Sequence, residues 1–445
     1  KDPELIQARI VRIQAALAGE LEDAAALLDE DMRAVARLRP NHPMLYRVTM
    51  LQALNDGNLV TARNVATRLT ELNAADPRLL AALGDAYVND AQYDALREAL
   101  PAWREAFPEN SDLLLLEATE CAERGDSEGR IRALEKAFEH NPVPELARRY
   151  ALALLENDRA RSASELLEDL PFRIGPHPAL LMLRSWAWAG QGDQAKGLAD
   201  WLAALKLRAT EPEVLAGMYN DARAWLDETQ MQQELTAQIQ KEGASATLSY
   251  ILHQARLQNP TASAAAAAET FARSLPAGHP LKPATQRAAA DGWLRLGQPE
   301  RALPTYKTLL DRGMRSAHVL NNAAYAAAQL GKDLPQAIDW ARQAVEAADD
   351  GVQKANYLDT LATAQWKGGL PYAAQQSFAL SIREKDNAAV RLHLAQLLAE
   401  QGRFYEAEPH LARAEQMAAN DDDEKVRQGA RALRGKYPPL AREDQ

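Results

Sequence analysis

Two kinds of marker recur along this sequence with one common period. Proline returns at a fixed slot, at Pro40, Pro108 and Pro142. Ala74 occupies the intermediate slot between Pro40 and Pro108. A residue suited to a tight turn stands 17 positions after the first three slots, at Gly57, Ala91 and Gly125. Neighbouring slots in both series lie 34 residues apart, or twice that. Glycine favours a tight turn and proline cannot continue a helix, so the period predicts a helix, a turn, a second helix and an exit. Such a chain folds as stacked repeats.

The side chains between the markers follow the same period. Leu80, Leu83, Gly84 and Tyr87 form a large–Leu–Gly–Tyr pattern in the first helix of one unit. The C-terminal third has turn glycines at Gly297, Gly331, Gly369 and Gly402. Small residues for the helix crossing stand seven positions before each of them, at Ala290, Ala324, Ala362 and Ala395. Small-then-large pairs follow in the second helices, at Ala302/Tyr306, Ala374/Phe378 and Ala407/Leu411.

These motifs resemble the tetratricopeptide-repeat (TPR) superfamily of helical solenoids. The resemblance implies an all-α fold, a right-handed superhelix of antiparallel helix pairs with the first helix of each pair on the concave face. It also implies a scaffold that binds peptides, helices or protein domains. At 34 residues per unit the chain has room for roughly a dozen repeats.

The regularity of the repeat varies along the chain and predicts four segments. Residues 1–171 form a regular TPR array, and residues 172–280 form a degenerate, irregular helical segment. A second TPR array covers residues 281–418. Residues 419–445 are predicted to form a capping helix and a tail.

Composition narrows the classes of partner. The net charge of −11 argues against binding nucleic acid, which depends on an excess of Lys and Arg. The same charge leaves basic proteins or a cationic polysaccharide open as partners. No apolar run is long enough to span a membrane. The chain begins at Lys1, without Met, so we expect a processed or cut product.

We find no motif that predicts catalysis, a cofactor or a metal site. Phosphate-loop and dinucleotide fingerprints are missing, and the eight histidines are scattered without a metal-binding spacing. Cys121, the single cysteine, occupies a core slot and is interpreted as a buried structural thiol. The acidic runs Asp29–Asp31 and Asp421–Glu424 are expected to be solvated. We therefore predict that the chain is not an enzyme.

The position of the small crossing residue also predicts which side chains face the concave groove. Side chains three positions before the crossing residue or one position after it are expected to point into the groove. Trp366 stands four residues after Ala362 and is expected to face the same side. The predicted partner-binding residues are Arg47, Asp85, Arg148, Arg287, Asp291, Asn321, Tyr325, Asp359 and Trp366. This mixture of charges, an amide and aromatic rings suits hydrogen bonding to a protein.

The leading functional hypothesis is a non-catalytic scaffold for a protein partner. Its Ala-, Leu- and Arg-rich degenerate repeats resemble bacterial envelope scaffolds of exopolysaccharide export, such as the Pel and cellulose export proteins. That resemblance implies a periplasmic location and a polysaccharide-modifying enzyme as partner, brought to an outer-membrane pore. The alternatives are a groove that binds polysaccharide directly and a cytoplasmic peptide-binding adaptor.

Overall fold

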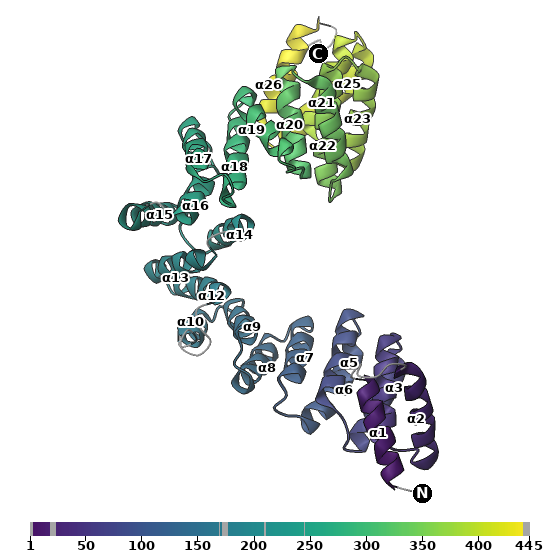
Figure 1. Cartoon of the computed structure of the whole chain (residues 1–445). Coiled ribbons are helices and arrows are strands. Elements are labelled where there is room, and N and C mark those ends of the chain that lie inside the picture. The colour runs from purple at the N-terminus through teal and green to yellow at the C-terminus, as the bar shows by residue number, and fades with distance from the viewer. Residues whose placement is uncertain are drawn as a thin grey trace. The chain divides into compact units, whose positions relative to one another are not determined.

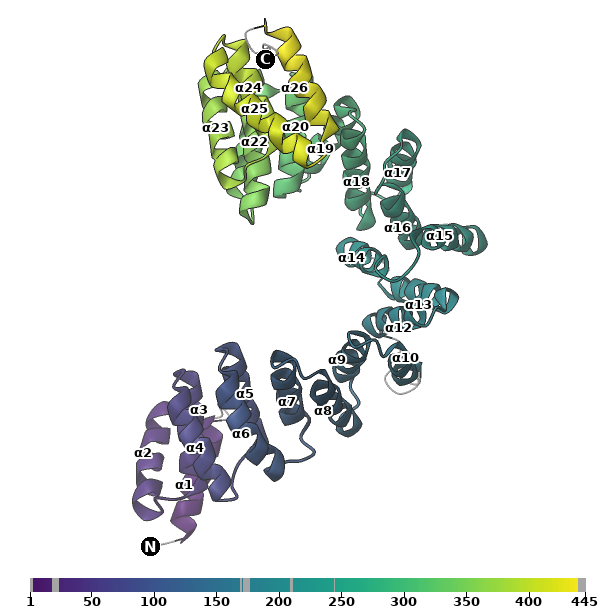
Figure 2. The ribbon, with the colours of Figure 1, turned by 180° about the vertical axis from the view of Figure 1, so that it is seen from behind.

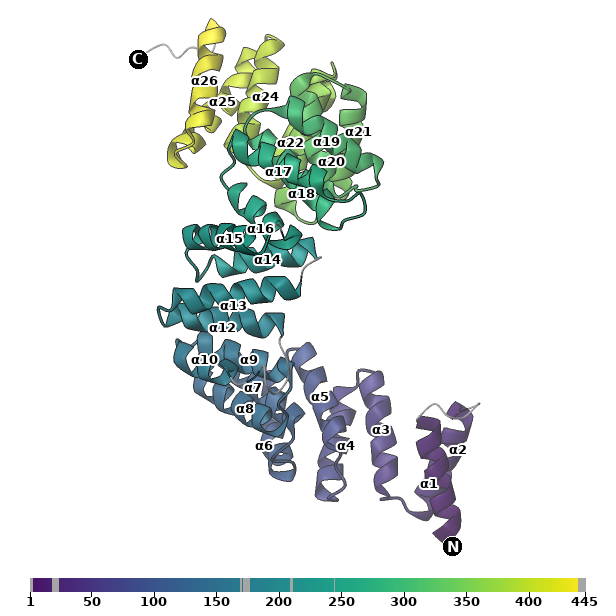
Figure 3. The same cartoon turned by 60° about the vertical axis from the view of Figure 1, so that its left-hand side comes forward.

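The structure is a computed structural model that describes residues 3–17, 24–168, 170, 177–208, 211–243 and 245–438. All regular secondary structure in these ranges is helical. The helices follow one another as antiparallel pairs joined by short turns (Figure 1), which Figure 3 shows side-on for α12 and α13. The fold is the expected TPR-type α-solenoid of antiparallel helix pairs.

The chain divides into two compact units. The N-terminal unit contains residues 1–207 and 221–227, and the C-terminal unit contains residues 208–220 and 228–445. The helices of the N-terminal unit are α1 (Pro3–Leu17), α2 (Ala24–Leu38), α3 (Pro43–Asn55), α4 (Leu59–Glu71), α5 (Pro77–Asn89), α6 (Tyr93–Ala106), α7 (Ser111–Glu123), α8 (Ser127–His140), α9 (Pro144–Leu155), α10 (Ala160–Glu168), α12 (Pro178–Gly190) and α13 (Gln194–Leu207).

One helix, α14 (Pro212–Ala222), has residues in both units. The remaining helices belong to the C-terminal unit. They are α15 (Glu228–Glu242), α16 (Ala246–Arg256), α17 (Ala262–Ser274), α18 (Leu281–Arg295), α19 (Pro299–Asp311), α20 (Ala317–Leu330), α21 (Leu334–Glu346), α22 (Gly351–Lys367), α23 (Pro371–Glu384), α24 (Ala388–Glu400), α25 (Phe404–Asn420) and α26 (Glu424–Lys436).

The predicted turns and helix ends are confirmed. Gly57 and Gly125 have φ of 68° and 76°, the left-handed conformation that glycine adopts without steric cost. Ala91 occupies the same slot with φ 54° and carries the strain of a Cβ there. Pro108 and Pro142 lie just after the last residues of α6 and α8. The period is thus set by local backbone requirements.

Helix starts are equally local in origin. The Asp76 side chain accepts a hydrogen bond from the Arg78 backbone N–H, and Pro77 occupies the first position of α5. An N-cap carboxylate satisfies a donor that the helix leaves unpaired, and proline there loses no hydrogen bond. Asp126 and Asp350 cap α8 and α22 in the same manner. These caps keep the connections between helices short.

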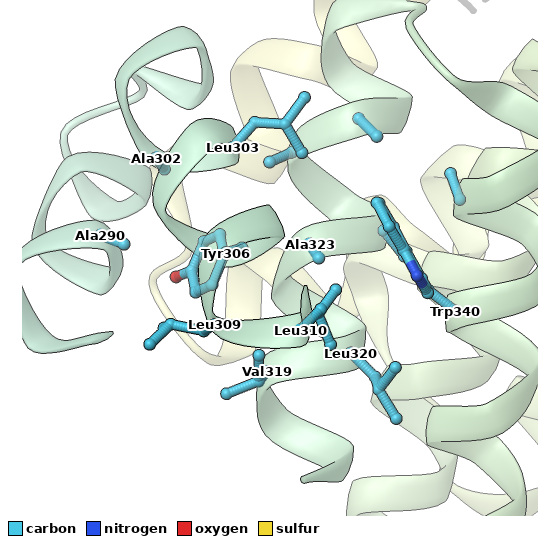
Figure 4. Close-up of a cluster of buried hydrophobic side chains, with 14 of the residues drawn as sticks. Ala290, Ala302, Leu303, Tyr306, Leu309, Leu310, Val319, Leu320, Ala323 and Trp340 are labelled. Atoms are coloured by element: carbon cyan, nitrogen blue, oxygen red, sulfur yellow. The ribbon is translucent and has the colours of Figure 1, made fainter. Parts of the chain in front are cut away.

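The core consists of successive clusters of small and large residues between neighbouring helices. Every predicted small-then-large pair of the C-terminal third is fully buried. Figure 4 shows the Tyr306 ring between Ala290 and Ala323, with its hydroxyl at the rim of the cluster on the side away from Trp340. In the N-terminal unit, a Cβ on Gly84 would collide with Leu116 of α7. Small crossing residues therefore allow the close approach on which the stack depends.

The prediction for the first acidic run is wrong at one residue. Asp31 is only 1% exposed, and its carboxylate accepts hydrogen bonds from Arg9 at 2.6 Å and from the Arg12 Nε at 2.8 Å. The two arginines lie on α1 and Asp31 on α2, so the pair of helices is joined by an ion cluster whose carboxylate is buried and whose guanidinium groups reach the surface. Asp29 and Glu30 remain exposed, as expected. Cys121 is buried, as predicted, and burial raises the pKa of its thiol.

Helix α26 packs at the C-terminal end of the described helices. Val426, Ala430 and Leu433 pack into the core formed with α24 and α25. Within the second acidic run, Asp421 and Asp422 are exposed and Asp423 caps α26 by accepting from the Val426 N–H. The rest of the predicted tail, residues 439–445, lies outside the described residues, as do residues 171–176 of the predicted irregular connector.

Candidate protein-binding surface

The first helices of the C-terminal unit are neighbours of one another. Helix α18 contacts α20, α20 contacts α22, and α22 contacts α24 (Figure 2). Six of the nine predicted binding residues lie on these helices. They are Arg287 and Asp291 on α18, Asn321 and Tyr325 on α20, and Asp359 and Trp366 on α22. We call the exposed and half-buried polar side chains of α18, α20, α22 and α24 the first-helix face.

Asp291 is the centre of a cluster that joins three helices. Its Oδ1 accepts hydrogen bonds from the Tyr306 hydroxyl at 2.5 Å and the Asn322 amide at 3.0 Å. The His318 Nε2 lies 3.2 Å from both carboxylate oxygens. Burial alone would raise the pKa of Asp291, but its hydrogen bonds with His318, Tyr306 and Asn322 hold it below the ordinary value. Burial and this carboxylate both raise the pKa of Tyr306. The cluster therefore presents a stable anion with an imidazole beside it.

A second cluster lies further along the same face. The His393 Nδ1 of α24 lies 2.9 Å from the Asp359 Oδ1 of α22. Tyr325 of α20 stands on the other side of this pair, with 36% of its surface exposed. Burial, and then the charge of Asp359, raises the pKa of Tyr325. Tyr325, Asp359 and His393 thus form a polar band across three consecutive repeats.

The Trp366 side chain lies partly in the core and partly at the first-helix face. Its ring is half-buried and packs against the core of the last repeats. Its indole N–H donates to the Glu400 carboxylate at 2.9 Å, and the Lys367 ammonium lies 4.8 Å from the ring centroid. Most of the ring is therefore engaged within the protein, and the polar edge with Glu400 contributes to the first-helix face.

Asn321 and Arg287 complete the described face. The Asn321 amide donates to the Asn322 Oδ1 at 3.2 Å. The Asn321 Oδ1 itself is buried and accepts no hydrogen bond from the described residues. Arg287 is half-buried on α18. Amide, imidazole, carboxylate, hydroxyl and guanidinium groups thus share one face, which gives it both donors and acceptors.

The three predicted residues of the N-terminal unit do not form such a face. Arg47 donates to the Ala74 carbonyl at 3.1 Å and so holds the loop before α5. Arg148 makes two hydrogen bonds with Glu145 of its own helix, which lower the pKa of Glu145 to about 2. Asp85 presents an exposed side chain whose carboxyl group is partly desolvated by its neighbours, and this desolvation, and then the charge of Asp112, raises its pKa. These side chains are separate from one another.

Sequence reasoning missed the partners that connect neighbouring repeats, namely His318, Asn322, His393 and Glu400. A usable signal was present for two of them. His393 follows Asp359 by 34 residues, and Glu400 follows Trp366 by the same 34. Complementary side chains one period apart lie at equivalent points of adjacent first helices and can meet. Asn322 and His318 carry no such spacing to Asp291.

A membrane-spanning helix and a cluster of metal ligands are both absent from the described residues. Within these ranges, no helix combines the length and hydropathy needed to cross a membrane. The same ranges contain no group of three or more His, Cys, Asp or Glu side chains arranged to hold a metal ion.

Comparison with known proteins gives remote likenesses of fold only. No family model matches this chain, and no curated protein matches it. Among solved structures, the Naa15/Naa10 complex bound to HypK-THB is similar over 91% of this chain and 68% of the other, with 13% identity and a TM-score of 0.36. Yeast Tom70 is similar over 90% of this chain and 97% of its own, with 14% identity and a TM-score of 0.34.

Proposed function

We propose that this chain is a non-catalytic scaffold that recruits a protein partner through the first-helix face of its C-terminal unit. The observation that carries the proposal is the polar band of Tyr325, Asp359 and His393, together with the Asp291 cluster on the same helices. Asp359 and His393, and likewise Asp291 and Asn322, are joined by hydrogen bonds between repeats, so these groups need little ordering when a partner binds.

The exposure of the face favours binding over chemistry. The side chains of His318 and His393 are 49% and 36% exposed on a helical surface. Acid–base catalysis gains its strength from groups held in sites that exclude water. An open face with many donors and acceptors instead suits the polar rim of a protein interface.

We place the scaffold, as a finer proposal, in the bacterial periplasm. There it would recruit a polysaccharide-modifying enzyme to an outer-membrane exopolysaccharide export pore. The support is the resemblance of the degenerate repeats to export scaffolds. A groove that binds polysaccharide directly has less support, because the Trp366 ring is engaged with the core and with Glu400. A cytoplasmic peptide-binding adaptor is the remaining alternative.

The test is site-specific photocrosslinking in the native cell, with the crosslinking residue at Tyr325 and, as control, at exposed Arg342 of α21. We expect a protein captured from position 325 and not from position 342. A periplasmic polysaccharide-modifying enzyme would support the finer proposal, and a cytoplasmic protein would refute it. Capture of no protein from Tyr325 would refute the scaffold proposal for this face.

With the captured partner purified, the face can be tested quantitatively. Tyr325→Ala and Asn321→Ala should each weaken binding by about tenfold, a change of about 1.4 kcal/mol. Arg342→Ala should leave the affinity unchanged. Equal affinities for all three variants would place the partner elsewhere on the chain.

A further inference from the structure

Two tyrosines are far more exposed than any aromatic residue of the first-helix face. Tyr372 of α23 is 78% exposed and Tyr405 of α25 is 94% exposed. Each stands three residues after a turn glycine, Gly369 or Gly402, and each is the second residue of its helix. They therefore occupy one slot in two consecutive repeats, at the edge of the stack where first helices turn into second helices.

In three other repeats this slot holds an acidic residue, which suits a helix start, and in α4 it holds the exposed Val60. Asp94, Glu128 and Glu300 are the second residues of α6, α8 and α19. A carboxylate there is favoured by the partial positive charge of the helix N-terminus. Tyrosine gains nothing from that charge, and at these exposures its ring gains little from packing. The substitution of ring for carboxylate in the last two repeats thus has no explanation in the stability of the fold.

The side chains that hydrogen-bond between the starts of α23 and α25 are fixed and together carry no net charge. Arg403, from the turn before α25, donates to Glu406 of its own helix and to the Gln375 side chain of α23 at 2.7 Å. It also donates to Gln401 at 3.0 Å. The guanidinium is paired with Glu406 and bridges the two repeats, so amide, guanidinium and carboxylate groups form a fixed strip at the helix starts that carry the two rings.

The geometry points to a polysaccharide-binding platform, in which Tyr372 and Tyr405 stack on sugar rings of one uncharged glycan chain. A hexose ring has an apolar C–H face that packs on an exposed aromatic face, and hydroxyl edges that bond to amides and carboxylates. Two equivalent rings one repeat apart match a ligand that is itself a repeat. The neutral strip at these helix starts gives no attraction to a charged polymer.

A protein partner fits this surface less well. The aromatic residues that dominate protein interfaces lie in well-packed pockets that a ring of neighbours shields from water. Tyr372 and Tyr405 instead project into solvent at the edge of the stack. This inference does not depend on the proposed function, which uses the first-helix face.

The test uses the full chain with cellohexaose as a neutral probe, and with hexamers of glucosamine and galacturonic acid as cationic and anionic probes. Fluorine NMR of the fluorotyrosine-labelled protein should show shifts confined to the Tyr372 and Tyr405 resonances when cellohexaose is added at millimolar concentration. Titration calorimetry should show that Tyr372→Ala or Tyr405→Ala weakens binding by about tenfold, and that the double variant abolishes it.

Matched variants separate stacking from general damage. Tyr372→Phe and Tyr405→Phe keep the ring and should bind within about threefold of the original chain. Val60→Ala changes an exposed residue at the same slot of α4 and should leave binding unchanged. Absence of binding by all three hexamers would overturn the platform. So would binding that survives in the double alanine variant, tighter binding of a charged hexamer, or a photocrosslinker at Tyr405 that captures a protein while cellohexaose fails to bind.

Discussion

The two units of this solenoid differ in the charged groups that they bury. Among its described residues, the N-terminal unit buries the carboxylates of Asp31, Glu120 and Asp200, each bonded to arginine, and the hydroxyls of Ser164 and Ser185. In the described part of the C-terminal unit the buried polar side chains are hydroxyls and one amide. Examples are Ser377, which donates to Gln365 at 2.8 Å, and Ser381, which donates to the Ala355 carbonyl at 2.7 Å.

This difference separates two ways of fixing neighbouring helices. A buried ion pair fixes geometry strongly, but the loss of one partner leaves a charge without its counterion. A buried hydroxyl fixes it weakly and can be lost at small cost. The C-terminal unit relies on close alanine packing, and its carboxylates Asp291 and Asp359 lie on the first-helix face instead. We expect the N-terminal unit to be the more sensitive to substitution and the C-terminal unit to carry the recognition surface.

The largest effect should come from Asp31→Ala. The substitution leaves Arg9 and Arg12 without their shared carboxylate and should lower the free energy of unfolding of the N-terminal unit by about 3 kcal/mol. Urea denaturation, combined with hydrogen exchange of the amides of α1 and α2, measures the change. Ser381→Ala in the C-terminal unit should cost about 1 kcal/mol.

Asp29→Ala provides the control within the same acidic run. Asp29 is 60% exposed and bonded to Arg33 of its own helix, so its loss should cost no more than about 0.5 kcal/mol. Equal effects of Asp29→Ala and Asp31→Ala would show that the buried position of Asp31 adds nothing to the stability of the N-terminal unit.

The second effect tests the C-terminal unit by pH. Burial, and then the charge of Arg256, lowers the pKa of His253 to about 4 from an ordinary value near 6.5. The unfolded chain therefore binds a proton at higher pH than the folded chain does. The protonation of His253 does not change the free energy of unfolding above pH 6.5. As the pH falls from 6.5 to 4, it lowers that free energy by up to about 3 kcal/mol.

His253→Leu should remove this part of the pH dependence. The measurement is the unfolding midpoint of the C-terminal unit in urea at several pH values between 7 and 4. The ring centroids of His253 and Phe271 lie 5.1 Å apart in a stacked arrangement, so the leucine variant can differ in stability at every pH. The quantity to compare is therefore the slope of the midpoint with pH. An unchanged slope would show that other groups dominate the acid response.

The fold could be predicted from sequence because its determinants are local. A turn that needs positive φ, an N-cap carboxylate and a small residue at a crossing each leave a mark at one position, and the period repeats it. The burial of Asp31 could not be predicted in this way. It depends on which side chains of α1 lie opposite, and no repeat marker records the position of Arg9 or Arg12.

The candidate surface was predictable in part. The crossing residue indicated that six side chains belong to the neighbouring helices α18, α20 and α22, but not that the Trp366 ring packs against the core and bonds to Glu400. A single helix is sufficient to predict which way a side chain points. Its partner lies one repeat away, so His393 and Glu400 become visible only when positions 34 residues apart are compared for complementary chemistry.

The third prediction concerns the crossing in the N-terminal unit. Gly84→Ala places a Cβ against Leu116, which must change rotamer, and should cost about 2 kcal/mol. The matched variant Gly435→Ala in α26 has open space around its new methyl group and should not destabilise the chain. Thermal unfolding of both variants makes the comparison. No loss for Gly84→Ala would show that the interface between α5 and α7 is looser than its packing suggests.

The smallest effect is expected from double-mutant cycles that compare an ion pair on first helices of the C-terminal unit with one on a first helix of the N-terminal unit. Asp359 and His393 join α22 to α24, whereas Glu145 and Arg148 lie on the single helix α9. The first pair should show a coupling energy of about 1 kcal/mol, and the second pair about 0.3 kcal/mol, since a contact within one helix restrains nothing beyond it. Chemical denaturation of the alanine variants gives both values. Equal couplings would mean that the band across α20, α22 and α24 is a set of solvated side chains. A larger coupling for Asp359 and His393 would mean that the first-helix face is held in place by the same contacts that hold the repeats together.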